Sequence, residues 1–139
     1  MKLDFLSSIG SFGSLVVLLS QLFISTGCDW SEMKPTPTFD ITILNASDQD
    51  LDWVKLIWDG PHIPGGILIR GKSSTAVAAP APKGNSATLE FVDEVTRERF
   101  THTISLTEFH SKNPESISRI IFRILSTESV ELVLVDTSL

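Results

Sequence analysis

Apolar and polar residues alternate along much of the chain after residue 38. The alternation is clear at residues 39–43 and 52–58, and short apolar stretches follow at 66–70 and 74–78. A period of two places every second side chain on one face of an extended strand. The pattern therefore predicts strands in these segments. Their shared apolar face includes Phe39, Ile41, Ile43, Val54, Leu56 and Trp58.

Two pairs of apolar segments further along the chain each flank a short polar stretch. The first polar stretch is Glu94–Glu98, and the second is Ser126–Ser129. Two strand-like segments joined by such a stretch are typical of a β-hairpin. In the first hairpin, the residues expected on the inward face are Ala87, Leu89, Phe91, Phe100, His102, Ile104 and Leu106.

The remaining segments predict almost no helical structure. Thr107–Ser116 predicts a single helical turn within a loop, because Pro114 limits its length. Ala78–Gly84 is rich in alanine and proline and cannot be a central strand, because proline lacks the N–H that a sheet ladder needs. We therefore predict an all-β domain over residues 39–139. The expected fold is a small immunoglobulin-like β-sandwich of about seven or eight mostly antiparallel strands.

The string from Gly66 to Ser73 matches the phosphate-loop signature of nucleotide-binding proteins. That motif needs a flexible loop after a strand and a helix that opens at the Lys-Ser pair. Here the variable positions are Ile67, Leu68, Ile69 and Arg70, which suit a strand, and the residues after Ser73 have no helical period. We expect no nucleotide site. Gly71 and Lys72 are instead predicted to form a tight turn between two strands.

The first 27 residues differ in kind from the rest of the chain. A short start is followed by the mostly apolar stretch Phe12–Ile24 and then by small residues, an order typical of a secretory signal peptide. Ser25-Thr26-Gly27-Cys28 resembles the lipobox of bacterial lipoproteins, in which the chain is cut just before a cysteine that carries lipid. The resemblance implies a lipoprotein signal peptide over residues 1–27 and a lipid on Cys28.

Two alternatives remain for this segment: an ordinary signal peptide and an uncleaved transmembrane anchor over Phe5–Ile24. All three possibilities export the residues that follow. Cys28 is the only cysteine in the sequence, so it has no disulfide partner, and lipidation explains a lone exported thiol. Residues 28–38 are polar and contain Pro35 and Pro37, which predicts a short extended tether.

Asp29 indicates in which membrane the lipid-anchored protein would be held. In enteric-type bacterial lipoproteins, an aspartate directly after the lipidated cysteine is a signal for retention in the inner membrane. The resemblance at Cys28-Asp29 therefore implies a protein of the bacterial cell envelope, anchored in the inner membrane by lipid and facing the periplasm.

The formal net charge of −6 restricts the partners. Nucleic acids and anionic lipid surfaces attract clusters of lysine and arginine, and the chain has no such block. We therefore expect no nucleic-acid partner, and contact with the membrane through the lipid on Cys28 alone.

Four aspartates between residues 48 and 59 have the spacing of a calcium-binding loop. Asp48, Asp50, Asp52 and Asp59 occupy its positions 1, 3, 5 and 12. However, Trp53 stands where such loops need glycine for a sharp turn. We therefore favour a hairpin turn whose Asn and Asp side chains bond their own backbone.

The sequence offers no clear catalytic or metal-binding set. His62, His102 and His110 lack the spacing of helical zinc ligands, and no cysteine joins them. His102 lies on an apolar strand face, which is typical of a hydrogen-bonded core residue. Asn45-Ala46-Ser47 matches an acceptor for N-glycosylation, which has meaning only in a eukaryotic secretory route. We expect no metal, no cofactor and no enzymatic activity.

Trp53 and Trp58 lie five positions apart, so they face opposite sides of an unbroken strand. One is expected in the core. The other, if exposed beside the Gly- and Pro-rich segment 59–66, would suit a protein-binding edge.

We therefore expect a lipid-anchored periplasmic binding protein without catalytic activity, acting on a protein partner. One version is an immunity-type lipoprotein that neutralises a toxin, since small acidic anchored domains without catalytic motifs resemble several such proteins. The alternative is a structural or assembly accessory lipoprotein of an envelope or secretion machine, and an envelope hydrolase is the third possibility. On the first hypothesis, a basic partner would meet a surface made of Asp48, Asp50, Asp52, Trp58 and Asp59.

Overall fold

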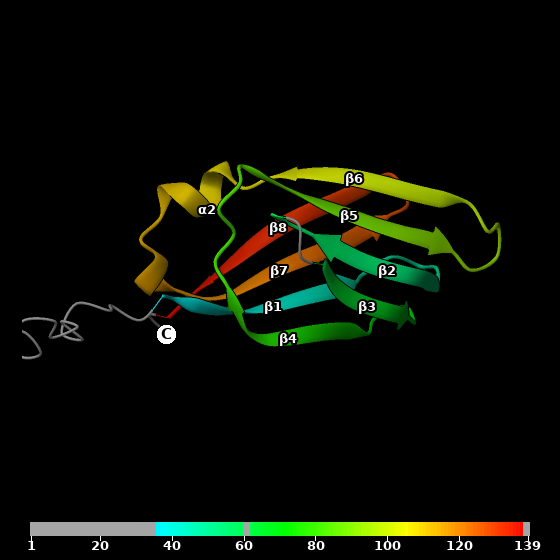
Figure 1. Ribbon diagram of the computed structural model, residues 1–139. Helices are drawn as coiled ribbons and strands as arrows, with labels where there is room; N and C mark the ends of the chain where they lie inside the picture. Colours follow the sequence, from blue (N-terminus) through cyan, green and yellow to red (C-terminus); the bar gives the residue numbers. More distant parts are fainter. Residues whose placement is uncertain (1–35, 60–61, 138–139) are drawn as a thin grey trace, which may run out of the picture. The chain divides into compact units, whose positions relative to one another are not determined.

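In the computed structural model, residues 36–59 and 62–137 are described, and they form two four-stranded sheets that pack face to face (Figure 1). The β1 sheet has the order β4 (Ser73–Pro80), β1 (Thr38–Asn45), β7 (Ile117–Ser126) and β8 (Ser129–Asp136). The β2 sheet has the order β3 (His62–Leu68), β2 (Leu51–Ile57), β5 (Ser86–Asp93) and β6 (Arg99–Ser105).

Neighbouring strands are antiparallel in both sheets, apart from the parallel pair β1–β7 at the centre of the β1 sheet. The predicted all-β sandwich of mostly antiparallel strands is therefore confirmed. The hairpins β5–β6 and β7–β8 turn where the two polar stretches predicted them. The chain changes sheet between β1 and β2, β3 and β4, β4 and β5, and β6 and β7.

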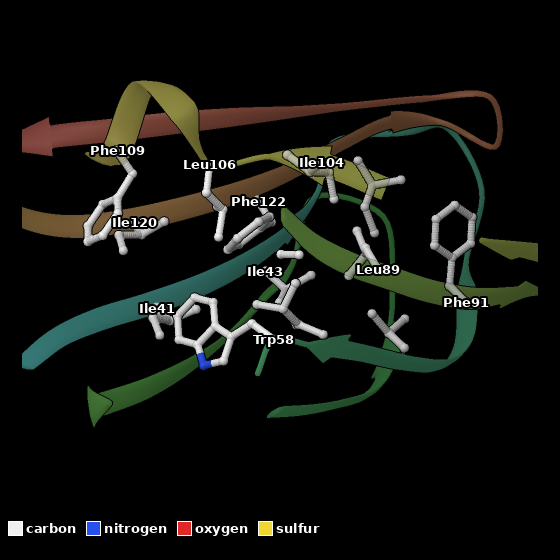
Figure 2. Packing of buried hydrophobic residues seen from close by; sticks show 14 of the residues in the cluster. Ile41, Ile43, Trp58, Leu89, Phe91, Ile104, Leu106, Phe109, Ile120 and Phe122 are labelled. Carbon is white, nitrogen blue, oxygen red and sulfur yellow. The ribbon is translucent and has the colours of Figure 1, made fainter. Parts of the chain in front are cut away.

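The core lies between the two sheets, where the alternating apolar side chains meet (Figure 2). In Figure 2 the Trp58 indole points in from the end of β2 toward Phe122 of β7, and their ring centroids are 6.3 Å apart. Every apolar residue predicted for the inward face of the first two strands is buried. These residues are Phe39, Ile41, Ile43, Val54, Leu56 and Trp58.

The short helical segment predicted after β6 is present. Helix α2 (Thr107–Ser111) and the 3₁₀ turn η2 (Pro114–Ser116) connect β6 to β7. Phe109 of α2 is buried with its ring edge against Phe39, at a centroid distance of 5.4 Å. This turn therefore covers one end of the core. Within residues 36–59 and 62–137, no helix has the length and apolar character that crossing a membrane requires.

The segment that matched a phosphate loop is a strand end, a turn and a strand start. β3 ends at Leu68, and β4 begins at Ser73 in the opposite sheet. Gly71 has a φ of +73°, which glycine adopts without strain, and the Lys72 N–H closes the turn by donating to the Ile69 carbonyl at 2.9 Å. The predicted turn is confirmed. No helix follows Lys72 to aim backbone N–H groups at a phosphate.

Asn45 joins this turn to the rest of the fold. The residue has no exposed surface, and its Nδ2 donates to the carbonyls of Gln49 (2.8 Å) and Leu68 (2.7 Å). Its Oδ1 accepts from the Ser47 hydroxyl (2.6 Å) and from the Ser47 N–H (3.1 Å). All four hydrogen-bonding positions of the amide are thus filled. A glycan on Nδ2 would displace one of these bonds, so the folded domain is not a glycosylation acceptor at Asn45.

The β5–β6 turn is built around a buried aspartate. Asp93 Oδ1 accepts from the N–H groups of Thr96 (2.7 Å) and Val95 (2.8 Å). These donors, with Thr96 first, lower the pKa of the Asp93 carboxyl, although burial acts in the opposite direction. Arg97 completes the turn with a φ of +61°.

We expect Asp93→Asn to remove a pH-dependent part of the stability. Because the pKa of Asp93 is lower in the folded state than in the unfolded chain, its charge stabilises the fold above about pH 4, the usual range of aspartate. That contribution is lost as the pH falls through the folded pKa. Urea unfolding at a series of pH values should show the native protein more stable than Asp93→Asn at pH 7, with the difference shrinking below pH 4. A difference that stays constant down to low pH would contradict this role of the charge.

Candidate functional site

Trp53 projects from the outer face of the β2 sheet, with 71% of its surface exposed. It alternates with the buried Val54, Leu56 and Trp58, and it lies at a bulge in β2. Asp52 pairs with Val92 of β5, but the next paired residue is Lys55, which pairs with Glu90, so β2 has one residue more than its partner strand. As a result Leu51 and Val54 are both buried.

The backbone of Trp53 is strained. Its φ of +50° lies in the left-handed region, which bulky side chains avoid. For an L-residue other than glycine this conformation costs about 1–2 kcal/mol. The Asp52 carboxylate accepts the Trp53 N–H at 3.1 Å and helps to hold the bulge. A large aromatic residue therefore occupies a position where the fold alone would favour glycine or asparagine.

Shallow hollows flank the indole on both sides. One is lined by Trp53 with Asp52, Gly66 and the exposed Ile67 of β3. The other lies over β5 and β6, and Val92 at its base is buried although it belongs to the outer face. We refer to the residues around the indole as the Trp53 surface. It consists of Trp53, Lys55, Ile67, Val92, Arg97 and Arg99.

The charge of the Trp53 surface differs from that of the whole chain. Arg97 pairs with Asp52 at 3.1 Å, and Lys55 pairs with Glu90 at 2.8 Å. Arg99 is exposed and makes no ion pair with any residue in the described part of the chain. Three cations against two carboxylates make the immediate surroundings of Trp53 slightly positive, whereas the chain carries −6.

The sequence-based choice of Trp58 as the surface aromatic is wrong. Trp58 is 4% exposed, because it lies on the same strand face as Val54 and Leu56 and packs into the core. Trp53 is the exposed member of the pair, which confirms that the two residues face opposite sides. A tryptophan among the outward-facing positions of β2 was the signal that could have identified it.

The four predicted acidic residues do not form one surface. Asp50 and Asp52 lie at the N-terminal end of β2, whereas Asp59 follows its C-terminal end. The Asp59 carboxylate accepts hydrogen bonds from the N–H groups of Lys83 and Gly84, the second at 2.8 Å. Asp50 accepts the Arg70 N–H at 2.9 Å, and Asp48 is exposed in the turn before β2. The predicted hairpin turn is wrong, because β1 and β2 lie in different sheets. Asn45 bonds the backbone of its own turn as expected, but Asp50 and Asp59 hold backbone of distant loops.

The structure also separates the candidate metal ligands. No three of His, Cys, Asp and Glu come together among residues 36–59 and 62–137. His102 is half-buried, stacks on Phe91 and contacts the Thr127 carbonyl through Nε2 at 2.7 Å, as a hydrogen-bonded core residue does. His110 bonds the Gly84 carbonyl at 2.8 Å, and His62 is exposed at the start of β3.

The predictions for the N-terminal segment lie outside the described residues. They concern the signal peptide over residues 1–27, the lipid on Cys28, the sorting residue Asp29 and most of the tether. Strand β1 begins at Thr38, the last residue of the predicted tether.

Comparisons with known proteins give one similar structure. No family model matches the chain. No curated protein matches it. Among solved structures, an NMR structure of a protein from Eubacterium rectale is similar with a TM-score of 0.48 and 15% sequence identity. The similarity covers 74% of this chain and 93% of that one.

Proposed function

We propose that this chain is an exported, lipid-anchored binding protein without catalytic activity, and that it binds a protein partner through the Trp53 surface. The lipobox-like sequence before Cys28 supports the anchor, and Asp29 supports an inner-membrane location facing the periplasm. The partner is then a periplasmic or envelope protein, either a toxin to be neutralised or a component of an envelope machine.

The observation that carries the proposal is that Trp53 is both exposed and strained. Exposed positions with unfavourable backbone angles tend to persist where they serve function. Burial does not explain this residue, since most of its surface is open to water. A role in contacting another molecule does explain it, because tryptophan and arginine are the residues most enriched among the energetic centres of protein interfaces.

The surroundings of Trp53 favour a partner of particular chemistry. The hollow between Trp53 and Ile67 suits an apolar side chain. Arg99 lies on the other side of the indole and has no carboxylate partner within the described residues, so it can pair with one from outside. We therefore propose a partner segment that presents an aliphatic or aromatic side chain next to Asp or Glu. This replaces the basic partner that the sequence suggested.

We expect Trp53→Gly and Trp53→Ala to lose the partner alike but to differ in stability. Both remove the indole, and only alanine retains the strain of a positive φ, so the glycine variant should be more stable by about 1 kcal/mol. Urea unfolding measures this difference. Partner loss is measured by capture from native membranes, with the tagged protein as bait. Mass spectrometry of the bait should show residues 1–27 absent and lipid on Cys28.

The matched control is Leu125→Ala, which removes an exposed apolar side chain from β7 in the other sheet. This variant should capture the same partner as the native protein. If Trp53→Gly still captures that partner in equal amount, the Trp53 surface is not the binding site. Arg99→Gln tests the partner chemistry separately, because it should weaken capture of an acidic partner and leave other partners unaffected.

A further inference from the structure

A hollow lies beside Trp58, where strands β2 and β4 end. Its lining consists of Trp58, Asp59, Pro80, Ala81 and Lys83, and its volume is about 260 Å³. Pro80 and Ala81 give it an apolar wall, and the buried Trp58 indole forms another part of the lining. Sites for drug-sized molecules usually have a volume of roughly 300–1,000 Å³, so this hollow suits a smaller ligand.

The indole N–H of Trp58 is a hydrogen-bond donor without an acceptor. Only 4% of the residue's surface is exposed, yet Nε1 makes no hydrogen bond to any of residues 36–59 and 62–137. Within these residues, the Arg123 Nε atom alone lacks both a partner and contact with solvent, so Trp58 Nε1 reaches solvent. In Figure 2 the ring nitrogen lies on the side of the indole away from Phe122. A buried indole N–H usually has a partner, and an acceptor in the hollow would supply one.

The loop that carries Lys83 is held in place from two sides. The Asp59 carboxylate accepts hydrogen bonds from the N–H groups of Lys83 and Gly84. A ring nitrogen of His110 bonds the Gly84 carbonyl at 2.8 Å. Glycine permits this close approach, because a Cβ at position 84 would lie 2.6 Å from Asp59 Oδ1. Both oxygens of Asp59 are thus already bonded to the backbone of this loop.

Lys83 adds an unpaired cation to the hollow. Its side chain is exposed and makes no ion pair with any residue in the described part of the chain. Because its backbone is already held in place, less freedom is lost when its ammonium group binds a ligand. The open polar groups of the hollow, the Trp58 N–H and the Lys83 ammonium, are therefore both donors.

We propose that this hollow binds small apolar carboxylates. The carboxylate of the ligand accepts hydrogen bonds from the Trp58 N–H and the Lys83 ammonium, and its apolar body lies against Pro80 and Ala81. The same chemical group occurs in a free carboxylic acid and at the C-terminal end of a peptide.

Titration of the ¹⁵N-labelled full-length protein with phenylacetate tests this proposal, and NMR follows the indole N–H signals. The Trp58 signal, which is the one that Trp58→Phe removes, should shift as phenylacetate binds. Phenylacetamide has the same shape without the charge, and acetate lacks the ring, so each should bind at least about tenfold more weakly. The dipeptide Gly-Phe presents the ring and the carboxylate at a chain end. Tighter binding of Gly-Phe than of phenylacetate indicates a peptide end as the ligand, and weaker binding indicates a free acid.

Two substitutions test the residues of the hollow separately. Lys83→Met removes the charge and nearly keeps the length of the side chain, so it should weaken phenylacetate binding at least about tenfold. Lys72→Met is the matched control, because Lys72 is an exposed lysine in the β3–β4 turn, and it should bind as the native protein does. Ala81→Leu places a larger side chain in the hollow and should prevent binding.

Three results would overturn the proposal. They are a Trp58 signal that phenylacetate does not shift, equal binding of phenylacetamide, and undiminished binding by Lys83→Met. None of these outcomes depends on the Trp53 surface, which lies nearer the other end of β2.

Discussion

Replacing Trp58 with alanine is expected to lower the free energy of unfolding by about 4 kcal/mol. The indole is 4% exposed and lies between the two sheets, where it packs against Phe122. Figure 2 shows it entering the core from the end of β2, so truncation to alanine leaves a cavity among buried side chains. The loss therefore combines the transfer of the indole to water with the energy of the cavity.

Urea unfolding at constant pH measures this effect as a shift of the midpoint. Trp53→Ala is the matched control, because it makes the same substitution five residues earlier, at an exposed position in β2. We expect it to change the free energy of unfolding by less than about 1 kcal/mol. Equal losses from the two variants would contradict the assignment of Trp58 to the core and Trp53 to the surface.

Asn45→Ala is expected to lower the free energy of unfolding by about 3 kcal/mol. The substitution removes the buried partner of the Leu68 carbonyl and of the Ser47 N–H, whereas the Ser47 hydroxyl and the Gln49 carbonyl still contact each other at 3.2 Å. The effect should exceed that of a typical hydrogen bond, because buried groups left unpaired lose both the protein bond and their hydration.

Thermal or urea unfolding of Asn45→Ala, compared with Asn85→Ala, tests this role. Asn85 is exposed, so its replacement should have an effect below about 0.5 kcal/mol. Asn45→Asp adds a sharper comparison, because it keeps the shape of the side chain and removes the Nδ2 donor. At neutral pH, Asn45→Asp should lower the free energy of unfolding at least as much as Asn45→Ala does. A mild effect of Asn45→Ala would show that the loop does not depend on this amide.

The strands could be predicted because the information for them is local. Alternation identified the inward faces, and the polar stretches at Glu94–Glu98 and Ser126–Ser129 identified two hairpins. The same alternation already placed Trp58 with Val54 and Leu56, so its burial was predictable. The expectation of an exposed Trp58 came instead from the Gly- and Pro-rich segment that follows.

The features that could not be predicted depend on distant parts of the chain. The bulge that gives Trp53 its positive φ and buries both Leu51 and Val54 is defined by the register with β5, and a single strand contains no sign of it. Asp50 accepts from Arg70, and Asp59 from Gly84, so their roles follow from how loops meet in the fold rather than from their spacing. The charge around Trp53 likewise combines residues of β2, β5, β6 and the β5–β6 turn.

The parallel pairing of β1 with β7 also determines when this domain can fold. Ile41 lies beside Ile120, so the central strand of the β1 sheet lacks one neighbour until most of the chain is available. Pairs between residues so distant in sequence slow folding, because a long loop must close before the contact forms. A chain that folds late stays unfolded while it is being made, which is the state in which a protein can be threaded across a membrane.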